Sequence, residues 1–355
     1  MNQFQAPVTN RVTGACSFAS NEPSQGVTML LGMSQADTPQ LDPQLQHVLD
    51  ELYAGDLMNW SGLDAVAVRA KFAGIKPAVT SPHIAHVEDI DVPSPADKGR
   101  TIPSRLYHPE PGKVLPLLVW FHGGGWVLGT LDGEEGTARL LAQRGHMAVL
   151  SVDYRLAPEH PFPAAIDDAV ACFDWACEHR SALSVSAVGV GGCSAGGNLA
   201  AVVSMQRAHS LRDGVHASPA HQLLVYPITD CIDDRASMLA LGDGLVLHRE
   251  HMRWFWDQYV PIAAERAHWR ASPLRGDVPA SMAPATILLA QLDPLLDEGL
   301  AYAEALRNSG VCVQVEVGQG LTHGFVGMCR KVAAARALFM STIDKVSAAL
   351  GAAQH

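Results

Sequence analysis

One stretch constrains the fold of this chain more than any other: residues 188–198, Val-Gly-Val-Gly-Gly-Cys-Ser-Ala-Gly-Gly-Asn. It passes from an apolar, β-branched segment into an alanine-rich one, which predicts a strand that leads directly into a helix. Its centre, Gly192–Gly196, fits the pattern G-x-S-x-G. A serine at such a sharp turn has a strained backbone and needs small neighbours on both sides. The turn would lift the Ser194 hydroxyl clear of the sheet, beside the N–H groups that begin the helix. A glycine-rich turn with an incidental serine is the alternative, and other parts of the chain must decide between them.

Apolar segments alternate with helical segments on both sides of this turn. The run at 115–121 is apolar throughout, as is typical of a buried parallel strand. We expect strands at 87–92, 105–108, 115–121, 148–152, 187–190, 222–226, 285–289 and 311–317, and helices at 137–144, about 165–180, 195–208, 298–308 and 331–350. Such alternation predicts the α/β class, with a mostly parallel central sheet and helices on both faces.

Two candidate partners of the serine follow late strands. Asp293 comes just after the strand expected at 285–289, and His323 lies in a loop after the final strand. Reactive groups in an open α/β sheet gather at the carboxyl ends of the strands, and the order serine, acid, histidine suits this kind of turn. Asp297 and Glu298 could supply the acid instead, but both fall at a helix start, where capping explains them. We therefore expect Ser194, Asp293 and His323 to form a catalytic set.

Composition excludes several classes of partner. The net charge of −11 argues against nucleic acid, and no apolar run reaches the length of a membrane span. The histidine pairs at 83/86 and 248/251 lack the spacing or the carboxylate of a metal site. A serine-based mechanism needs no metal and no organic cofactor, so we expect neither. With 355 residues, 48% of them hydrophobic, the chain suits one large domain, or a core domain with a cap.

The domain organisation is suggested by where the alternation of strands and helices begins and by one stretch that interrupts it. Residues 1–40 are polar, and their single apolar patch is too short and too weakly flanked by basic residues for a signal peptide, which favours a cytoplasmic location. We expect a flexible N-terminal extension at 1–40, N-terminal cap helices at 41–85, a catalytic core at 86–227 and 281–355, and a helical cap insertion at 228–280.

The insertion is rich in aromatic side chains, including Trp254 and Trp256. These rings can pack the core of the insertion itself, or they can cover an active site together with the N-terminal helices. We take Trp254 and Trp256, with Trp126 and Cys193, as candidate residues of a substrate pocket.

Five motifs together resemble the microbial branch of the hormone-sensitive-lipase family of α/β-hydrolases. They are His122-Gly-Gly-Gly-Trp126, Asp153-Tyr-Arg-Leu-Ala-Pro-Glu159, Gly192-Cys-Ser-Ala-Gly-Gly-Asn198, Asp293-Pro-Leu-Leu-Asp-Glu298 and His323-Gly-Phe325. The resemblance implies the α/β-hydrolase fold and hydrolysis of a small carboxylic ester, with Ser194 as nucleophile, Asp293 as acid and His323 as base. It also implies an oxyanion hole made by the N–H groups of Gly124, Gly125 and Ala195. Assembly as a monomer or a homodimer stays open.

Cys193 is a departure from this resemblance, because the family usually has aspartate immediately before the nucleophile. Two other functions share the fold. An amidase or formamidase would carry an identical triad, whereas a non-catalytic ligand receptor would lack the serine or the base. Because a cap limits the depth of the pocket, esters with short to medium acyl chains are the expected substrates.

Overall fold

The computed structural model describes residues 40–73, 82–95, 97–210, 217–232, 234–243 and 245–353, which belong to one compact unit from Pro39 to His355. The expected extension, apart from Gln40, lies outside the described residues. In the described ranges, no helix combines the length and the hydropathy that crossing a membrane would require.

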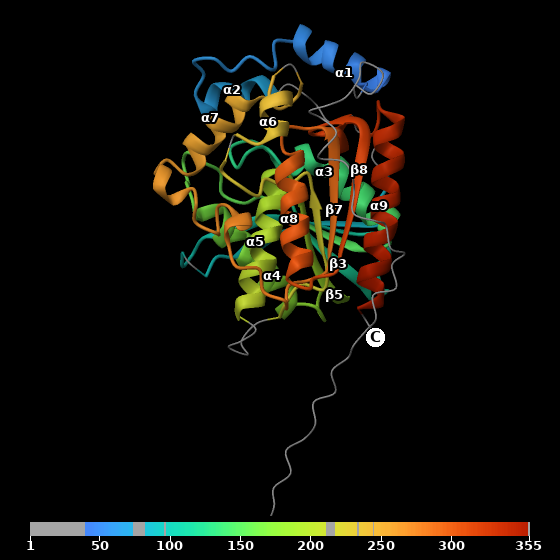
Figure 1. Cartoon of the computed structure of the whole chain (residues 1–355). Helices are drawn as coiled ribbons and strands as arrows, with labels where there is room; N and C mark the ends of the chain where they lie inside the picture. The colour runs from blue at the N-terminus through green and yellow to red at the C-terminus, as the bar shows by residue number, and fades with distance from the viewer. Residues whose placement is uncertain are drawn as a thin grey trace, which may run out of the picture. The chain divides into compact units, whose positions relative to one another are not determined.

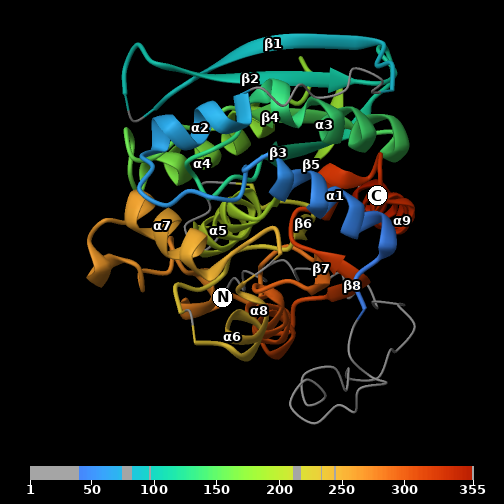
Figure 2. The same cartoon turned by 90° about the horizontal axis from the view of Figure 1, so that it is seen from above.

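The centre of the fold is an eight-stranded sheet in the order β1-β2-β4-β3-β5-β6-β7-β8 (Figure 2). β1 pairs antiparallel with β2, β2 pairs antiparallel with β4, and every other pairing is parallel. The strands are β1 (His86–Pro93), β2 (Thr101–His108), β3 (Leu115–Phe121), β4 (Ala148–Val152), β5 (Val185–Cys193), β6 (Gln222–Val225), β7 (Ala285–Leu292) and β8 (Val313–Thr322). The predicted mostly parallel α/β sheet is therefore confirmed.

Helices cover both faces of the sheet because its central strands are apolar on both sides (Figure 1). In β3, Leu117 and Val119 pack in one buried cluster with α4 (Ala164–Glu178), α5 (Ala195–Ser210) and α8 (Leu296–Asn308). Leu118 and Trp120 point the other way, into a second cluster with α1 (Pro43–Ala54), α3 (Leu131–Gly145) and α9 (Ala333–Ala352). Alternate side chains of one strand thus contribute to two separate cores.

Four helices gather at the upper end of the sheet in Figure 1: α1, α2 (Ala65–Ala73), α6 (Ala236–Leu241) and α7 (Arg249–Tyr259). α1 begins as the sequence predicts, because the Asp42 carboxylate accepts hydrogen bonds from the N–H groups of Gln44 and Leu45 at 2.8 and 3.2 Å. The described residues also contain the short 3₁₀ segments η3 (Ala263–Glu265), η4 (Pro273–Arg275) and η5 (Phe325–Met328).

α3 differs most from the sequence prediction, which places its start at residue 137. The helix begins at Leu131, because the Thr130 hydroxyl accepts a hydrogen bond from the N–H of Gly133 at 3.0 Å and caps it. Gly133 and Gly136 lie within this first part of the helix. Glycine lowers intrinsic helix propensity, and the two glycines therefore concealed the true start.

Candidate active site

The serine turn forms where β5 meets α5, as the motif predicts. Ser194 has a φ of +56°, and its N–H donates to the carbonyl of Val225 on the neighbouring strand at 2.9 Å. A Cβ on Gly192 would collide with the backbone of Gly196, and one on Gly196 would collide with the carbonyl of Phe121. Both flanking positions therefore require glycine for lack of space, which explains the G-x-S-x-G pattern.

The three residues expected to form a catalytic set lie in hydrogen-bond contact. Ser194 Oγ is 3.0 Å from His323 Nε2, and His323 Nδ1 is 2.8 Å from Asp293 Oδ2. Asp293 is fully buried, and its other oxygen accepts from the N–H of Leu295 at 2.9 Å. With Nδ1–H donated to Asp293, Nε2 carries the lone pair that accepts the serine hydroxyl. This arrangement suits proton transfer from Ser194 to His323.

Tyr226 packs against the side of the His323 ring and is not among the site residues predicted from the sequence. The centroid of its ring lies 4.6 Å from that of His323. The residue has a φ of +34°, and its N–H donates to the carbonyl of Leu288 at 2.6 Å. Because this contact depends on how the segment after β6 turns, no pattern in the sequence indicates it.

The glycine-rich loop after β3 faces the serine turn. A Cβ on Gly123 would lie 3.5 Å from Cβ of Ser194. Gly124 and Gly125 have φ values of +111° and +58°, which favour glycine. Among the described residues, no backbone acceptor pairs with the N–H groups of Gly124, Gly125 or Ala195. These three expected oxyanion donors are therefore available to a ligand.

Gly125 also receives the ring of Phe255 from α7, and a Cβ at this position would collide with that ring. The sequence predicts an aromatic cluster in this region but contains no signal that singles out Phe255. The loop that carries the expected oxyanion donors is thus packed directly against α7.

Of the three tryptophans expected near the substrate, Trp126 and Trp256 lie in contact, whereas Trp254 has other neighbours. Trp126 is fully buried and stacks on Tyr259 at 4.2 Å between ring centroids, with Trp256 at 5.0 Å. Trp256 also lines a cavity of about 320 Å³, together with Met238, Met252 and other side chains. Trp254 instead contacts Trp60, with the ring centroids 5.5 Å apart. Only Trp256 of the three borders this cavity.

Cys193 packs in the buried cluster that contains Tyr226, whereas the three tryptophans belong to the cluster on the other face of the sheet. Burial raises the pKa of its thiol well above the usual value, so the group is neutral. Its side chain is therefore separated from the residues with which the sequence analysis grouped it.

The capping roles expected for Asp297 and Glu298 are wrong, because both carboxylates bind other segments. Asp297 Oδ2 accepts from the N–H of Ser237 at 2.8 Å. Glu298 Oε1 accepts from the N–H groups of Thr229 and Asp230 at 2.6 and 3.3 Å. Burial raises the pKa of Glu298 to about 8. These acids fix the segment after β6 and the start of α6 onto α8.

A histidine cluster at the start of α7 is the one place where the described residues bring three possible metal ligands together. Atoms of His248, Glu250 and His251 lie within 4.8 Å of one another. The two rings are stacked at 4.4 Å with an interplanar angle of 8°. Because the lone pairs of an imidazole lie in its ring plane, two parallel rings cannot direct them at one ion. His251 Nε2 instead contacts the carbonyl of Met58 at 3.0 Å and joins α7 to the chain after α1.

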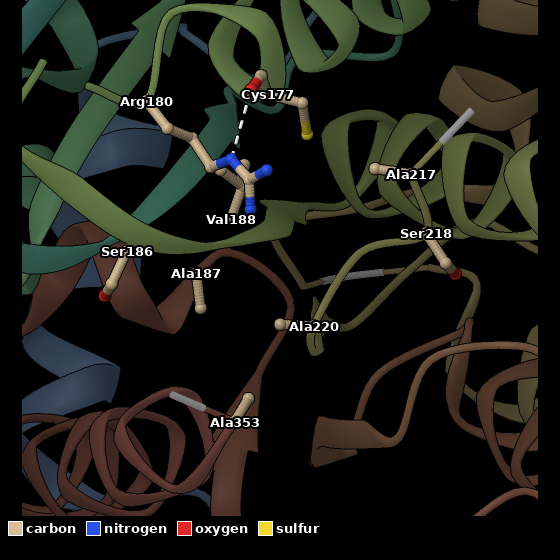
Figure 3. A pocket seen from close by; sticks show the side chains of 9 residues that line it. All are labelled: Cys177, Arg180, Ser186, Ala187, Val188, Ala217, Ser218, Ala220 and Ala353. Carbon is tan, nitrogen blue, oxygen red and sulfur yellow. Dashed lines mark hydrogen bonds between the residues drawn. The ribbon is translucent and has the colours of Figure 1, made fainter. Parts of the chain in front are cut away.

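A second cavity, of about 330 Å³, lies near the opposite end of β5 from Ser194 (Figure 3). Arg180 and Cys177 line it, and the Arg180 Nε–H donates to the carbonyl of Cys177 at 3.1 Å. Its remaining lining residues are Ser186, Ala187, Val188, Ala217, Ser218, Ala220 and Ala353. This set has no histidine or carboxylate beside a nucleophile, in contrast to the surroundings of Ser194 at the other end of the strand.

Comparison with known proteins agrees with this geometry. A family model described as the alpha/beta hydrolase fold matches residues 118–327. The chain belongs to the α/β-hydrolase family, in its hormone-sensitive-lipase-like branch. The predicted fold class is thereby confirmed.

Several similar proteins are named as ester hydrolases. The carboxylic ester hydrolase LipN of Mycobacterium tuberculosis is 42% identical over 301 residues, which cover 82% of this chain and 78% of that protein. The ethyl acetate hydrolase of Pseudomonas putida is 36% identical, over 82% of this chain and 92% of its own. A solved esterase from Pyrobaculum calidifontis superposes with a TM-score of 0.77 at 34% identity, over 87% of this chain and 98% of its own. The chain is thus an enzyme of a family in which carboxylesterases are well represented.

Proposed function

We propose that this enzyme hydrolyses carboxylic esters with short to medium acyl chains, through a covalent acyl-enzyme on Ser194. The observation that carries the proposal is the continuous contact from Ser194 Oγ through His323 to Asp293, at 3.0 and 2.8 Å. The names of the relatives support the reaction class, and the geometry supports the roles of the residues.

In the first half of the reaction, His323 Nε2 takes the proton of Ser194 as Oγ attacks the ester carbonyl carbon. Buried Asp293 stabilises the imidazolium that results. As the tetrahedral intermediate collapses, the carbon–oxygen bond to the alcohol breaks, and His323 returns the proton to the departing alkoxide. Water then attacks the acyl-enzyme by the same route, which releases the acid and restores the Ser194 hydroxyl.

In the tetrahedral intermediate the carbonyl oxygen becomes negatively charged. The N–H groups of Gly124, Gly125 and Ala195 are assigned the role of stabilising this charge by hydrogen bonds. Ala195 is the first residue of α5, where backbone N–H groups have no partner within the helix. In other serine hydrolases, each such donor contributes about 3 kcal/mol to stabilisation of the transition state. Three donors at fixed positions would supply much of the rate enhancement.

The limit on acyl length is supported by the packing of α7 over the oxyanion loop, where the ring of Phe255 lies against Gly125. Phe255 is 5% exposed, so a long acyl chain that extends past Gly125 would have to displace this buried ring.

The experiment is a rate profile over p-nitrophenyl esters of increasing acyl length, with p-nitroacetanilide as the amide control and Ser194→Ala as the inactive control. We expect kcat/KM to be greatest for short to medium chains and to fall for long ones. The anilide should react far more slowly than the acetate ester. Comparable turnover of the anilide would assign the site to an amidase, and esterase activity retained by a folded Ser194→Ala would refute the nucleophile.

A further inference from the structure

Arg69, on α2, reaches the loop that carries two of the proposed oxyanion donors. Its Nε–H donates to the carbonyl of Val127 at 2.8 Å, and Nη2 donates to the carbonyl of Ala157 at 2.7 Å. Nη1 and Nη2 also contact the two carboxylate oxygens of Glu159, at 2.7 and 2.8 Å. One guanidinium thus joins a helix near the start of the described chain to two separate loops.

Both carbonyls belong to fully buried residues, Val127 and Ala157. A buried backbone carbonyl needs a hydrogen-bond partner from the protein, since water cannot readily supply one there. Arginine suits this task because its planar donor fork reaches several acceptors at once, which the single ammonium of lysine cannot do.

The bonded loop residues are tied in turn to the oxyanion loop. The carbonyl of Gly124 accepts from the N–H groups of Val127 and Leu128, at 3.1 and 2.8 Å. The N–H of Ala157 donates to the carbonyl of Trp126 at 2.9 Å. Arg69 therefore closes a circuit of hydrogen bonds around the turn 124–128.

We propose that Arg69 is a positioning residue for the oxyanion hole: it holds the turn 124–128 so that the N–H groups of Gly124 and Gly125 stay aimed at the reacting carbonyl. The inference rests on the proposed esterase function. Donors stabilise an oxyanion best when they are already in place, and small displacements of such groups reduce the rate strongly. Loss of the guanidinium should therefore weaken binding of the transition state more than binding of the ester.

A purely structural role, in which Arg69 only attaches α2 through its ion pair with Glu159, makes a different prediction. The side chain of Glu159 is 48% exposed, so the ion pair contributes little by itself. Glu159→Gln removes this charge but leaves both carbonyl contacts of Arg69 in place. The two roles can thus be separated with a pair of substitutions.

The experiment compares Arg69→Met, Arg69→Lys and Glu159→Gln with the wild-type enzyme. Arg105→Met serves as a matched control, because Arg105 is also an ion-paired arginine, with Asp89 and Asp132 as partners, but lies on β2. For each folded protein, kcat and KM for p-nitrophenyl acetate are measured, together with Ki for an aryl trifluoromethyl ketone, whose adduct with serine mimics the tetrahedral intermediate.

We expect Arg69→Met to lower kcat about ten- to a hundredfold and to raise Ki by a similar factor, with KM changed less than about threefold. The kcat and Ki of Arg69→Lys should lie between those of Arg69→Met and those of the wild type. Glu159→Gln and Arg105→Met should retain kcat within about threefold.

Unchanged kcat and Ki in folded Arg69→Met would overturn the inference, as would an equal loss in Glu159→Gln. If Arg69→Met does not fold, Arg69→Lys decides, and full kcat in that variant contradicts the proposal. Failure of the proposed function looks different, since the wild-type enzyme would then lack esterase activity or Ser194→Ala would retain it.

Discussion

Cys193 is the residue at which the sequence was expected to depart from the family pattern, and its surroundings indicate what a charge at this position would affect. Its thiol is buried in the same cluster as Tyr226, whose ring contacts that of His323 at 4.6 Å. Burial raises the pKa of the thiol, which keeps position 193 uncharged. The thiol also lies next to Gly123, since a Cβ built on that glycine would be 3.2 Å from Cys193 Sγ. A charge introduced at position 193 would therefore lie close to the serine turn, in buried surroundings that screen it weakly.

Cys193→Asp should therefore move the acid limb of kcat/KM to higher pH, by several tenths to about one unit. An ionised carboxylate at this position favours the imidazolium form of His323, so the free base is lost at a higher pH. The measurement is a pH–rate profile of a p-nitrophenyl ester. Cys193→Ser, which adds no charge, should leave the limb in place. An acid limb that is unchanged or lower in a folded Cys193→Asp variant would contradict the expected coupling.

The residues of the proposed triad could be predicted from sequence because each follows a strand in a fixed order. Ser194 is marked by its flanking glycines, and Asp293 and His323 follow late strands. Tyr226, Phe255 and Arg69 could not be found in this way. Their roles arise from contacts between segments distant in the sequence, such as Arg69 with Val127, and no local pattern records such contacts.

At the scale of elements, α7 presents two tryptophans to different surroundings, because residues two apart on a helix point in nearly opposite directions. Trp256 is 4% exposed and borders the cavity with Met252. Trp254 packs on Trp60, which also stacks on His251 at 4.0 Å between ring centroids. Trp256 also lies against Trp126 of the glycine-rich loop, at 5.0 Å between ring centroids, whereas Trp254 joins α7 to the segment after α1.

We expect Trp256→Ala to change substrate preference and Trp254→Ala to change thermal stability. Trp256→Ala should change the ratio of kcat/KM between short and medium acyl esters, because it enlarges the cavity. Trp254→Ala should leave that ratio nearly constant and lower Tm by roughly 5 °C, through loss of ring packing. Kinetics on two esters and a thermal melt of each variant provide the test. The reverse pattern would place the acyl group on the other side of the helix.

The ends of helices and strands could be predicted where the sequence changes sharply from apolar to polar residues. β3 and β4 occupy the residues that their apolar runs indicate, 115–121 and 148–152. The start of α3 was concealed by Gly133 and Gly136. The interpretation of Asp297 and Glu298 as caps failed because a carboxylate at a helix start can also bind the backbone of a neighbouring segment, and sequence does not distinguish the two.

For the molecule as a whole, the buried acid Glu298 links global stability to pH. It is 1% exposed and accepts from backbone N–H groups of Thr229 and Asp230. Burial raises its pKa to about 8 from an ordinary value of 4.5. Between these two values the folded protein holds a proton that the unfolded chain releases, so the free energy of unfolding should fall as pH rises from 4.5 to 8.

The substitution Glu298→Gln should reduce the loss of unfolding free energy between pH 4.5 and 8. Glutamine keeps a carbonyl oxygen for the two N–H donors and carries no charge, so the variant should gain stability relative to the wild type as pH increases from 5 to 8. Urea unfolding at pH 5, 6.5 and 8 measures the difference. Glu134, whose pKa burial raises to about 7, contributes equally to both proteins. Parallel curves for the two proteins would show that Glu298 does not carry the effect.

The proposed acyl-enzyme on Ser194 depends on the whole molecule, since β5, β7 and β8 must bring the serine, aspartate and histidine together. The most direct measurement is reaction of the enzyme with a p-nitrophenyl phosphonate, followed by mass spectrometry of its peptides. We predict release of p-nitrophenol, one covalent adduct per chain on Ser194 with parallel loss of esterase activity, and no adduct in Ser194→Ala. An adduct on another residue, or full esterase activity with Ser194 modified, would contradict the account.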